Sequence, residues 1–338
     1  MIVTRTPTRI PLGGGGTDIR SYASRYGGFL VSAAIKRYVY ITVNSRFEDS
    51  IRVSYSKTEI ADSVGDIEHP IVRETLRFLG LDGSLEIVSI ADVPANTGLG
   101  SSGAFTVGLL NALHTFKREN VSAETLAEEA STILMDVLDE PIGVHDQYLA
   151  ALGGITCLAI DQDGTVQASP LATSDGIVEE LETSLLVFYT GVKRSASDVL
   201  ADESRAISHS LDGVTAALHT VKEIGFQVKE ALETGNLRRF GELLDLHWQS
   251  KKRLSTKVSS DRIDHLYELA KRSGALGGKI MGAGGGGFFV FYCDNHNKAR
   301  VREVMAAEGL RDMRFAIDFE GSKVLVNFCW YARKRSGT

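Results

Sequence analysis

The chain has 338 residues, which is long for one hydrophobic core, so we expect two domains. Its 43% hydrophobic and 24% charged residues are typical of a soluble globular protein. The net charge of -6 leaves no basic surplus to neutralise a nucleic-acid backbone, although a local basic cluster can still bind a phosphorylated small molecule.

Neither the start of the chain nor its apolar runs indicate a secreted or membrane protein. Residues 1–5 lack the composition of a signal peptide, and no apolar run approaches the ~20 residues that a membrane helix needs. Cys157, Cys293 and Cys329 are widely spaced in apolar, strand-like surroundings, which favours buried thiols in a reducing compartment. We therefore expect a cytoplasmic protein.

The first glycine cluster occupies positions 13–16, between Arg9 and Asp18. Successive glycines cannot form a strand interior, because each adds conformational entropy and contributes no packing. A flexible loop is one interpretation. The short run, without serine, favours instead a backbone that approaches a ligand closely. Residues 27–43 then predict a turn followed by β-rich sequence.

The second glycine cluster, residues 94–104, connects a strand to a helix. Residues 69–79 predict a modest helix and residues 85–90 a strand, and apolar side chains after the cluster recur at helical spacing. Unpaired N–H groups at the start of such a helix favour an anion, and the hydroxyls of Ser101 and Ser102 can bind phosphate or Mg²⁺. A plain turn with a serine N-cap is the alternative. The glycines favour phosphate binding.

Gly98, Gly100 and Gly103 match the dinucleotide pattern G-x-G-x-x-G, but the acidic residue expected about 20 positions later at a strand end is missing. No Gly-Lys-Ser/Thr completes a Walker A loop either. Pro94 to Gly103 instead resembles the phosphate loop of the GHMP kinases, P-x-x-x-G-L-G-S-S-[AG], at every fixed position. The resemblance implies an ATP-phosphate site formed by Pro94, Gly98, Leu99, Gly100, Ser101, Ser102 and Gly103, with Ser102 as a Mg²⁺ ligand.

The first cluster resembles a further GHMP motif, which reads R-V-N-L-I-G-E-H-T-D in galactokinases. Gly15 and Gly16 replace the glutamate and histidine that bind the sugar there, so a galactokinase is not expected. The pattern G-G-G-G-T-D, continued through residues 27–43, resembles the D-glycero-D-manno-heptose 7-phosphate 1-kinases and related sugar kinases. The matching residues are Arg9, Leu12, Gly14, Thr17 and Asp18, and the implied substrate-binding residues are Gly14, Gly15, Gly16, Thr17 and Asp18.

Residues 123–138 predict an amphipathic helix, and Gly143-Val144-His145-Asp146-Gln147 follows it. An Asp-Gln pair at a helix start could merely be an N-cap. GHMP kinases carry their catalytic aspartate in a motif of this form, G-x-x-D-Q, so the resemblance implies that Asp146 is catalytic. Arg9, where it adjoins Asp146, would keep that carboxylate ionised and offset charge on the transferring phosphoryl group. His145 is assigned no role, because a histidine at a helix start is more often structural.

The chain departs from the family at the metal site. Galactokinase-like members carry a Mg²⁺-binding glutamate about one helix length before the catalytic aspartate, and Leu134 stands at that position here. Leu134 falls within the apolar stripe, so we expect it to pack, and Asp136 would need a register shift to replace the glutamate. Metal ligation then rests on Ser102, nucleotide phosphates and water, or catalysis is weakened.

The second half begins with a predicted strand at residues 185–190. The segment 191–198 is either a solvated turn or a phosphate-recognition site, with Lys193 and Arg194 as the candidate ligands of a substrate phosphate. Helices are expected at 196–210, 215–233, 238–254 and 298–308, and strands near 314–319 and 324–328. His247 and Lys251 lie four residues apart on one helix face, so they could meet a phosphorylated substrate, but a solvated basic face is the favoured interpretation.

The third glycine cluster, residues 277–291, predicts a strand, a glycine turn and a strongly apolar strand. It resembles the third GHMP motif, whose loop packs beside the phosphate loop. The resemblance adds Gly284 and Gly285 to the ATP site.

The fold implied by the resemblance is α+β. Residues 1–182 would form a domain like ribosomal protein S5 domain 2, and residues 183–338 a ferredoxin-like domain. The implied reaction is phosphorylation of a sugar at its anomeric hydroxyl with ATP and Mg²⁺, most directly of D-glycero-D-manno-heptose 7-phosphate. A fucose- or galactose-like substrate, or a binding protein without turnover, are the alternatives. We expect no nucleic-acid or membrane partner, and the oligomeric state stays open.

Overall fold

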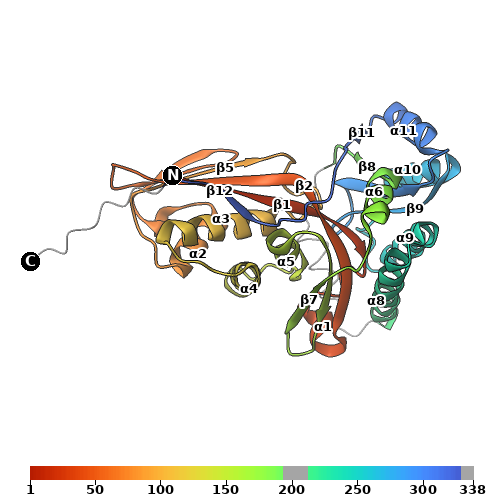
Figure 1. Cartoon of the computed structure of the whole chain (residues 1–338), viewed down its shortest axis with the longest axis horizontal. Coiled ribbons are helices and arrows are strands. Elements are labelled where there is room, and N and C mark those ends of the chain that lie inside the picture. Colours follow the sequence, from red (N-terminus) through yellow and green to blue (C-terminus); the bar gives the residue numbers. More distant parts are fainter. Residues whose placement is uncertain (193–211, 329–338) are drawn as a thin grey trace, which may run out of the picture.

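The computed structural model describes residues 1–192 and 212–328, and these residues form two β-sheets with helices packed against them (Figure 1). The larger sheet has eight strands, in the order β12-β1-β2-β5-β3-β4, with β6 pairing to β2 and β7 pairing to β6. The smaller sheet has four strands, in the order β11-β8-β10-β9. The fold is therefore α+β, as expected from the sequence.

Two long strands, β1 (Ile2–Gly13) and β2 (Gly28–Ser45), form the centre of the larger sheet. They pair antiparallel from Ile2 opposite Val43 to Gly13 opposite Val31, and the register shifts between Pro7 and Thr8. The first glycine cluster thus begins where β1 ends. The other strands of this sheet are β3 (Ile51–Ser54), β4 (Thr58–Ala61), β5 (Leu85–Ala91), β6 (Ile155–Ile160), β7 (Val166–Pro170) and β12 (Lys323–Asn327).

Helices α2, α3 and α4 lie along one face of the larger sheet (Figure 1). Helix α3 (Ser101–Lys117) is buried on almost every side, because it packs between the sheet and its neighbouring helices. The remaining helical segments of this half are α1 (Arg20–Tyr26), η1 (Val64–Asp66), α2 (Pro70–Phe78), α4 (Ala123–Ser131), the π-helical turn η2 (Thr132–Val137) and α5 (His145–Leu152).

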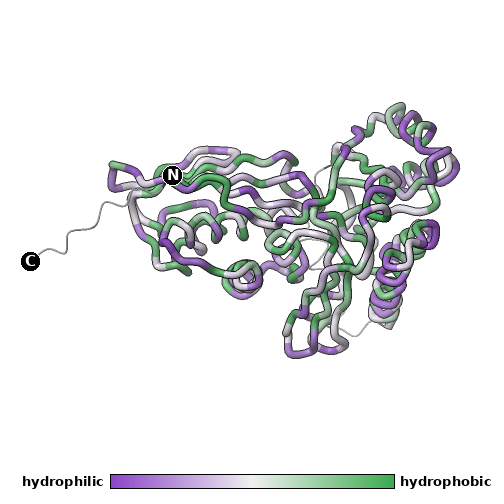
Figure 2. The backbone as a smooth tube through the Cα atoms, viewed as in Figure 1, coloured by the Kyte–Doolittle hydropathy of each residue, from purple (hydrophilic) through white to green (hydrophobic). Residues whose placement is uncertain are grey.

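The second half builds its core around β10 (Phe288–Cys293), whose six residues are all buried. Apolar side chains concentrate on the strands of both sheets, whereas the outer helices alternate between polar and apolar residues (Figure 2). The other elements are α6 (Asp175–Ser184), β8 (Leu185–Tyr189), α8 (Asp212–Glu233), α9 (Leu237–Lys251), α10 (Asp261–Arg272), β9 (Ala275–Ile280), α11 (Lys298–Ala307) and β11 (Arg311–Asp312).

Two expectations about the end of the chain are wrong. Residues 314–319 form no strand and contribute only an isolated bridge between Ile317 and Ile35. The last strand, β12, does not complete the second half, because it pairs with β1 at the edge of the larger sheet. The helix expected at 196–210 lies outside the described residues, and the boundary between residues 182 and 183 remains a prediction.

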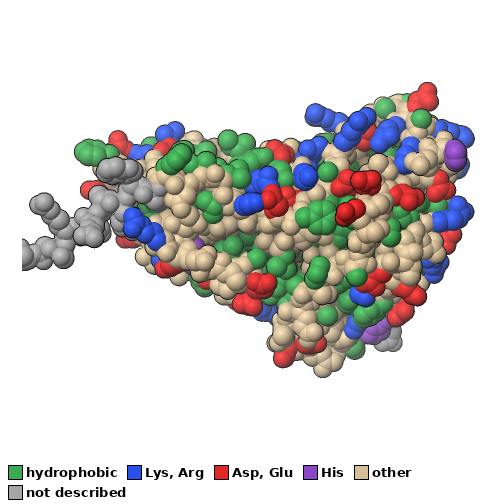
Figure 3. Space-filling model, in the orientation of Figure 1, with side chains coloured by type: hydrophobic (Ala, Val, Ile, Leu, Met, Phe, Trp, Pro, Cys, Tyr) green, Lys and Arg blue, Asp and Glu red, His purple; other side chains and the backbone are tan. Residues whose placement is uncertain are grey.

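The surface and the helices also bear on possible partners. Basic and acidic side chains are interspersed across the face shown in Figure 3, in keeping with the modest net charge. Within residues 1–192 and 212–328, no helix combines the length and the apolar character needed to cross a membrane.

Candidate active site

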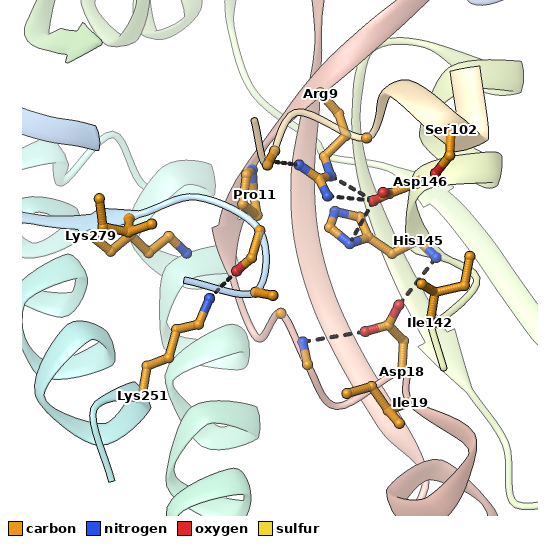
Figure 4. Close-up of a pocket in the computed structure, with 18 of the residues that line it drawn as sticks. Arg9, Pro11, Asp18, Ile19, Ser102, Ile142, His145, Asp146, Lys251 and Lys279 are labelled. Carbon is orange, nitrogen blue, oxygen red and sulfur yellow. Dashed lines mark hydrogen bonds and ion pairs between the residues drawn. The ribbon is translucent and has the colours of Figure 1, made fainter. Parts of the chain in front are cut away.

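A pocket between the two halves collects the residues that the three glycine clusters and the Asp-Gln motif predicted (Figure 4). Its walls come from the end of β1, the loop after it, the start of α3, the start of α5, helix α9 and the turn after β9. The residues that line it include Arg9, Gly15, Gly16, Asp18, Gly98, Gly100, Ser101, Ser102, His145, Asp146, His247, Lys251, Lys279, Gly282 and Ala283.

The phosphate loop lies in the pocket with glycines where its backbone requires them. Gly98 and Gly100 adopt φ angles of 83° and 75°, which side-chain-bearing residues rarely adopt. No side chain caps the start of α3, so the N–H groups of its first turn remain available to an anion beside Ser101 and Ser102. This geometry agrees with the predicted phosphate site.

Three other predicted members of that site have structural contacts. Leu99 is buried, and its carbonyl accepts a hydrogen bond from the Arg9 N–H at 3.0 Å. The Pro94 carbonyl accepts one from the Thr97 hydroxyl at 2.8 Å, within the turn before the helix. Gly103 packs against Asp146. These three residues shape the loop, and any contact of theirs with ATP remains a prediction.

Asp146 and Arg9, the two predicted catalytic residues, form an ion pair in the pocket. Arg9 Nε donates to Asp146 Oδ1 at 2.7 Å, and Nη2 lies 2.6 Å from the same oxygen. Arg9 Nη1 donates to the Gly98 carbonyl at 2.5 Å, which ties the pair to the phosphate loop. Burial is the largest single influence and raises the pKa of Asp146, but Arg9 and His145 together outweigh it and hold the pKa below its usual value. The carboxylate is therefore ionised at neutral pH.

The second oxygen of Asp146, a residue that lines the pocket, has different surroundings from the first. No described residue donates a hydrogen bond to Oδ2, whereas Oδ1 takes all the contacts of Arg9. A β-carbon at Gly100 would lie only 3.1 Å from Oδ2, so the glycine leaves this oxygen accessible. Asp146 thus presents a bare carboxylate oxygen next to the phosphate loop.

His145, which sequence reasoning left without a role, is part of the site. Its Nε2 lies 3.1 Å from the Ser32 hydroxyl, which itself donates to the Ile10 carbonyl at 2.9 Å. Its Nδ1 lies 3.4 Å from Asp146 Oδ1. Burial and the nearby Arg9 lower the pKa of His145 to about 3, so the ring is neutral. A neutral histidine held by Ser32 of the β-sheet therefore lies against Oδ1, the same oxygen of Asp146 that contacts Arg9.

The first glycine cluster divides into structural and pocket residues. Gly14 has a φ of 76°, and a β-carbon there would collide with the Phe29 carbonyl. Gly15 and Gly16 line the pocket without side chains. Thr17 is buried away from it, with its hydroxyl 2.8 Å from the Gly14 carbonyl. The structure therefore gives Gly14 and Thr17 roles in the loop, and leaves Gly15 and Gly16 beside the space for a substrate.

Asp18 is buried at the edge of the pocket. Its carboxylate accepts hydrogen bonds from the N–H groups of His145 at 3.2 Å and Gly16 at 3.3 Å. Burial and the neighbouring negative charge of Asp146 raise the pKa of Asp18 above its usual value. Asp18 holds the glycine loop against the start of α5, and its position in the lining agrees with the predicted substrate contact.

The third glycine cluster packs beside the phosphate loop, as expected. The α-carbons of Gly98 and Gly282 are close enough that a β-carbon on Gly282 would lie 2.6 Å from Gly98. The pocket is lined by Gly282 and Ala283. Gly284 and Gly285 pack on Val258 instead, whose carbonyl accepts from the Gly285 N–H at 2.7 Å. Their assignment to the ATP site stays a prediction.

The interpretation of His247 and Lys251 as a solvated face is wrong. Both side chains are buried, because this face of α9 packs against β9, and both line the pocket. Lys279 of β9, which sequence reasoning missed, is 1% exposed and lies beside them. A lysine within a glycine-rich segment next to an apolar strand is the signal that could have found it. Lys193 and Arg194 lie outside the described residues.

Leu134 packs, as expected. It is 1% exposed in the π-helical turn η2, and Asp136 is turned outward into an ion pair with Arg20 at 2.6 Å. Among the described residues, no group of three or more His, Cys, Asp or Glu side chains is placed to hold a metal. Ser102, the predicted protein ligand, lines the pocket. Its role in holding Mg²⁺ remains a prediction.

A second pocket adjoins the first on the other side of the phosphate loop. The two share Asn96, Ser101 and Ser102. In the second pocket the His69 ring stacks on Phe105 with centroids 5.0 Å apart, and Tyr55 meets His69 edge-on at 4.6 Å. A ligand could therefore place a flat, apolar group there while its phosphates reach the start of α3.

A helix start with available N–H groups, next to an ionised carboxylate with one free oxygen, is the arrangement expected of a phosphotransferase. The comparisons with known proteins agree. Residues 66–154 match the GHMP kinases N terminal domain and residues 228–310 match GHMP kinases C terminal. A D-glycero-alpha-D-manno-heptose 7-phosphate kinase of Campylobacter jejuni is 30% identical over 95% of this chain and 98% of that protein.

Solved structures give the same result. A putative sugar kinase from Campylobacter jejuni is 29% identical, with a TM-score of 0.76 over 96% of this chain and 97% of that one. A D-glycero-D-manno-heptose 1-phosphate kinase from Bacteroides thetaiotaomicron shares the fold, with a TM-score of 0.80 at 24% identity over 97% of this chain and 100% of that one. The chain belongs to the GHMP kinase family, and within it to the sugar kinases that use ATP.

Proposed function

We propose that the chain transfers the γ-phosphoryl group of ATP to the anomeric hydroxyl of D-glycero-D-manno-heptose 7-phosphate, in the cytoplasm, giving the 1,7-bisphosphate. The observation that carries the chemistry is the free Oδ2 of Asp146 beside the uncapped start of α3. The heptose 7-phosphate kinase similarity supports the choice of sugar. The side-chain-free lining at Gly15 and Gly16 agrees, because it lacks the groups with which galactokinases bind their hexose.

The nucleotide would occupy both pockets. Its base fits the second pocket beside His69 and Phe105, and its phosphates fit the N–H groups of the first turn of α3. Ser102 would hold Mg²⁺ together with phosphate oxygens and water, and that ion, when bound, neutralises charge on the phosphates. ATP as the phosphoryl donor follows from the family, and the Mg²⁺ ligand is part of this proposal.

Asp146 would accept the proton of the sugar hydroxyl at Oδ2. The anomeric oxygen then forms a bond to the γ-phosphorus while the bond to the ADP oxygen breaks. Arg9 keeps Asp146 ionised through Oδ1 and would offset the negative charge of the transferring group. Positioning and electrostatics supply most of the rate enhancement in such reactions.

An assay of ADP release tests the proposal against the alternatives. The panel contains D-glycero-D-manno-heptose 7-phosphate, the same heptose without phosphate, fucose, galactose and mannose 6-phosphate. We expect kcat/KM to be highest for heptose 7-phosphate. Preferred use of fucose or galactose would overturn the sugar assignment, and binding of ATP without turnover on any sugar would indicate a protein that has lost catalysis. The ionised Asp146–Arg9 pair favours turnover.

A further inference from the structure

Three basic side chains line the part of the pocket that the second half contributes, and Figure 4 shows two of them, Lys251 and Lys279. His247 and Lys251 lie one turn apart on α9, and Lys279 lies on β9. Their exposed fractions are 1%, 8% and 1%. A cluster of basic side chains with this degree of burial is unusual, because removing an ammonium group from water is costly without a counter-charge.

The described residues do not supply that counter-charge to Lys279. Its ammonium group has one hydrogen bond, to the Leu12 carbonyl at 3.3 Å, and no described carboxylate pairs with it. Its charged neighbours are Lys251 and Arg9, which together with burial lower its pKa well below the usual value. Lys251 donates to the Gly282 carbonyl, at the turn after β9.

His247 gives an independent indication of a missing ligand. Both of its ring nitrogens are buried, and neither has a hydrogen-bond partner among residues 1–192 and 212–328. Buried polar side-chain atoms normally have a hydrogen-bond partner, and leaving such an atom without a hydrogen bond costs about 1–3 kcal/mol. An imidazole without partners next to a lysine without a counter-ion indicates that an anion with several acceptor oxygens completes this wall.

The cluster and Ser102, at the start of α3, lie on opposite sides of the Asp146–Arg9 pair. In Figure 4, Lys251 and Lys279 lie on one side of Arg9 and Asp146, and Ser102 lies on the other. A nucleotide phosphate at Ser102 approaches Asp146 from the α3 side. The acceptor must present its hydroxyl to Asp146 from within the pocket, so its far end extends away from the nucleotide.

We propose that His247, Lys251 and Lys279 bind the phosphate group that the sugar substrate already carries. This inference rests on the proposed function, because it assigns the 7-phosphate of the heptose to this wall while the anomeric hydroxyl meets Asp146. Two ammonium groups and an imidazole match the charge and the acceptor oxygens of a phosphate dianion. The cluster thereby gives specificity for a phosphorylated sugar. Gly15 and Gly16 cannot supply it, because they have no side chains.

Methionine substitutions test the proposal while preserving the apolar stem of each lysine. Lys279→Met and Lys251→Met are compared with Lys252→Met, a matched control at the end of α9 whose ammonium pairs with Asp264 at 3.4 Å. For each variant, KM is measured for heptose 7-phosphate, for the unphosphorylated heptose and for ATP. We expect KM for heptose 7-phosphate to rise at least tenfold in the first two variants, with KM for ATP within twofold of the wild type.

Calorimetric titration of heptose 7-phosphate without nucleotide provides a readout that does not depend on turnover. Its Kd should rise in parallel with KM, and the Lys252→Met protein should bind like the wild type. Should Lys279→Met fail to fold in a melting experiment, Lys251→Met and His247→Gln decide the question, since each removes another member of the cluster.

Several results would overturn the inference and leave the proposed function standing. A raised KM for ATP with unchanged KM for heptose 7-phosphate would assign the cluster to the nucleotide. No change in either would make Lys279 a structural lysine. Loss of sugar-phosphate binding only in Lys193→Ala/Arg194→Ala would assign the phosphate to that segment instead. Equal use of phosphorylated and unphosphorylated heptose by the wild type would overturn the proposed substrate itself.

Discussion

Gly103 and Asp146 are in direct contact: a β-carbon added at Gly103 would lie 2.7 Å from the β-carbon of Asp146. The first turn of α3 therefore packs on the first turn of α5, although the two residues belong to separate motifs. This contact sets the distance between the phosphate loop and the Asp146 carboxylate. A kinase needs that distance to be defined, because the acceptor hydroxyl must meet the γ-phosphorus in line.

Gly103→Ala should lower kcat by up to ~10²-fold, because the added methyl group displaces Asp146, and a displacement of about 1 Å is enough for such a loss. Steady-state kinetics and a melting curve measure the effect on rate and fold. Gly176→Ala is the control, since Gly176 is also helical and a β-carbon there meets nothing within 4 Å. A kcat of Gly103→Ala equal to that of the wild type would show that α3 and α5 can move apart without any loss of rate.

Asp146→Asn should lower kcat by about 10²–10⁴-fold, the range expected when a positioned proton acceptor is lost. The Kd for ATP should change little, because in the proposed arrangement Asp146 contacts the acceptor and the phosphates bind at the start of α3. Rapid-quench turnover and a separate nucleotide titration check the two parts.

The control for this substitution is Asp136→Asn, whose carboxylate forms an outward ion pair with Arg20. Its kcat should match the wild type. Turnover of Asp146→Asn within a few-fold of the wild type would remove Asp146 from the reaction.

Parts of this site were predictable from short, contiguous segments. The phosphate loop and the Asp-Gln motif each place their functional groups within about ten residues, so a pattern of residue types is enough to find them. The sequence alone could not establish that Arg9 pairs with Asp146, because the pairing depends on β1 passing behind the phosphate loop. The structure places the Arg9 N–H on the Leu99 carbonyl and its guanidinium on Asp146.

The basic wall was not predictable in the same way. The spacing of His247 and Lys251 describes a helix face equally well whether that face is solvated or buried. Only the packing of α9 on β9 decides between them, and that contact also buries Lys279. The return of β12 to β1 was missed for a related reason, since strand pairing over more than 300 residues leaves no local pattern.

His145 should make stability depend on pH. Its pKa is about 3 in the folded chain against about 6.5 in an unfolded one, so between these values the unfolded chain binds the extra proton. Stability is therefore fully present above about pH 6.5 and falls as the pH decreases toward 3, by up to ~1.4 kcal/mol per pH unit. His145→Gln should reduce this slope by about one proton, measured by urea unfolding between pH 7 and 4.5.

The buried His247 also has a lowered pKa, so His145→Gln should leave part of the slope in place. The same change at His265, which is half exposed, controls for the loss of a surface imidazole. If stability depends on pH as steeply in His145→Gln as in the wild type, His145 takes up its proton in the folded chain as readily as in the unfolded one. His145 would then be a charged partner of Asp146 at acidic pH and not a neutral one.

Leu134→Glu tests whether this kinase can accept the metal-binding glutamate of its galactokinase-like relatives. Leu134 is 1% exposed, so a carboxylate there should destabilise the fold by about 3 kcal/mol, the scale of an unpaired buried charge. The half-saturating Mg²⁺ concentration should not fall, because the side chain points into the core.

Val137→Glu, at a 49% exposed site in the same π-helical turn, should change stability by no more than about 0.5 kcal/mol. Urea unfolding and a Mg²⁺ titration of kcat separate the two possibilities. An unchanged stability together with a lower Mg²⁺ requirement would mean that η2 can rotate residue 134 into the pocket, and metal binding would then not rest on Ser102.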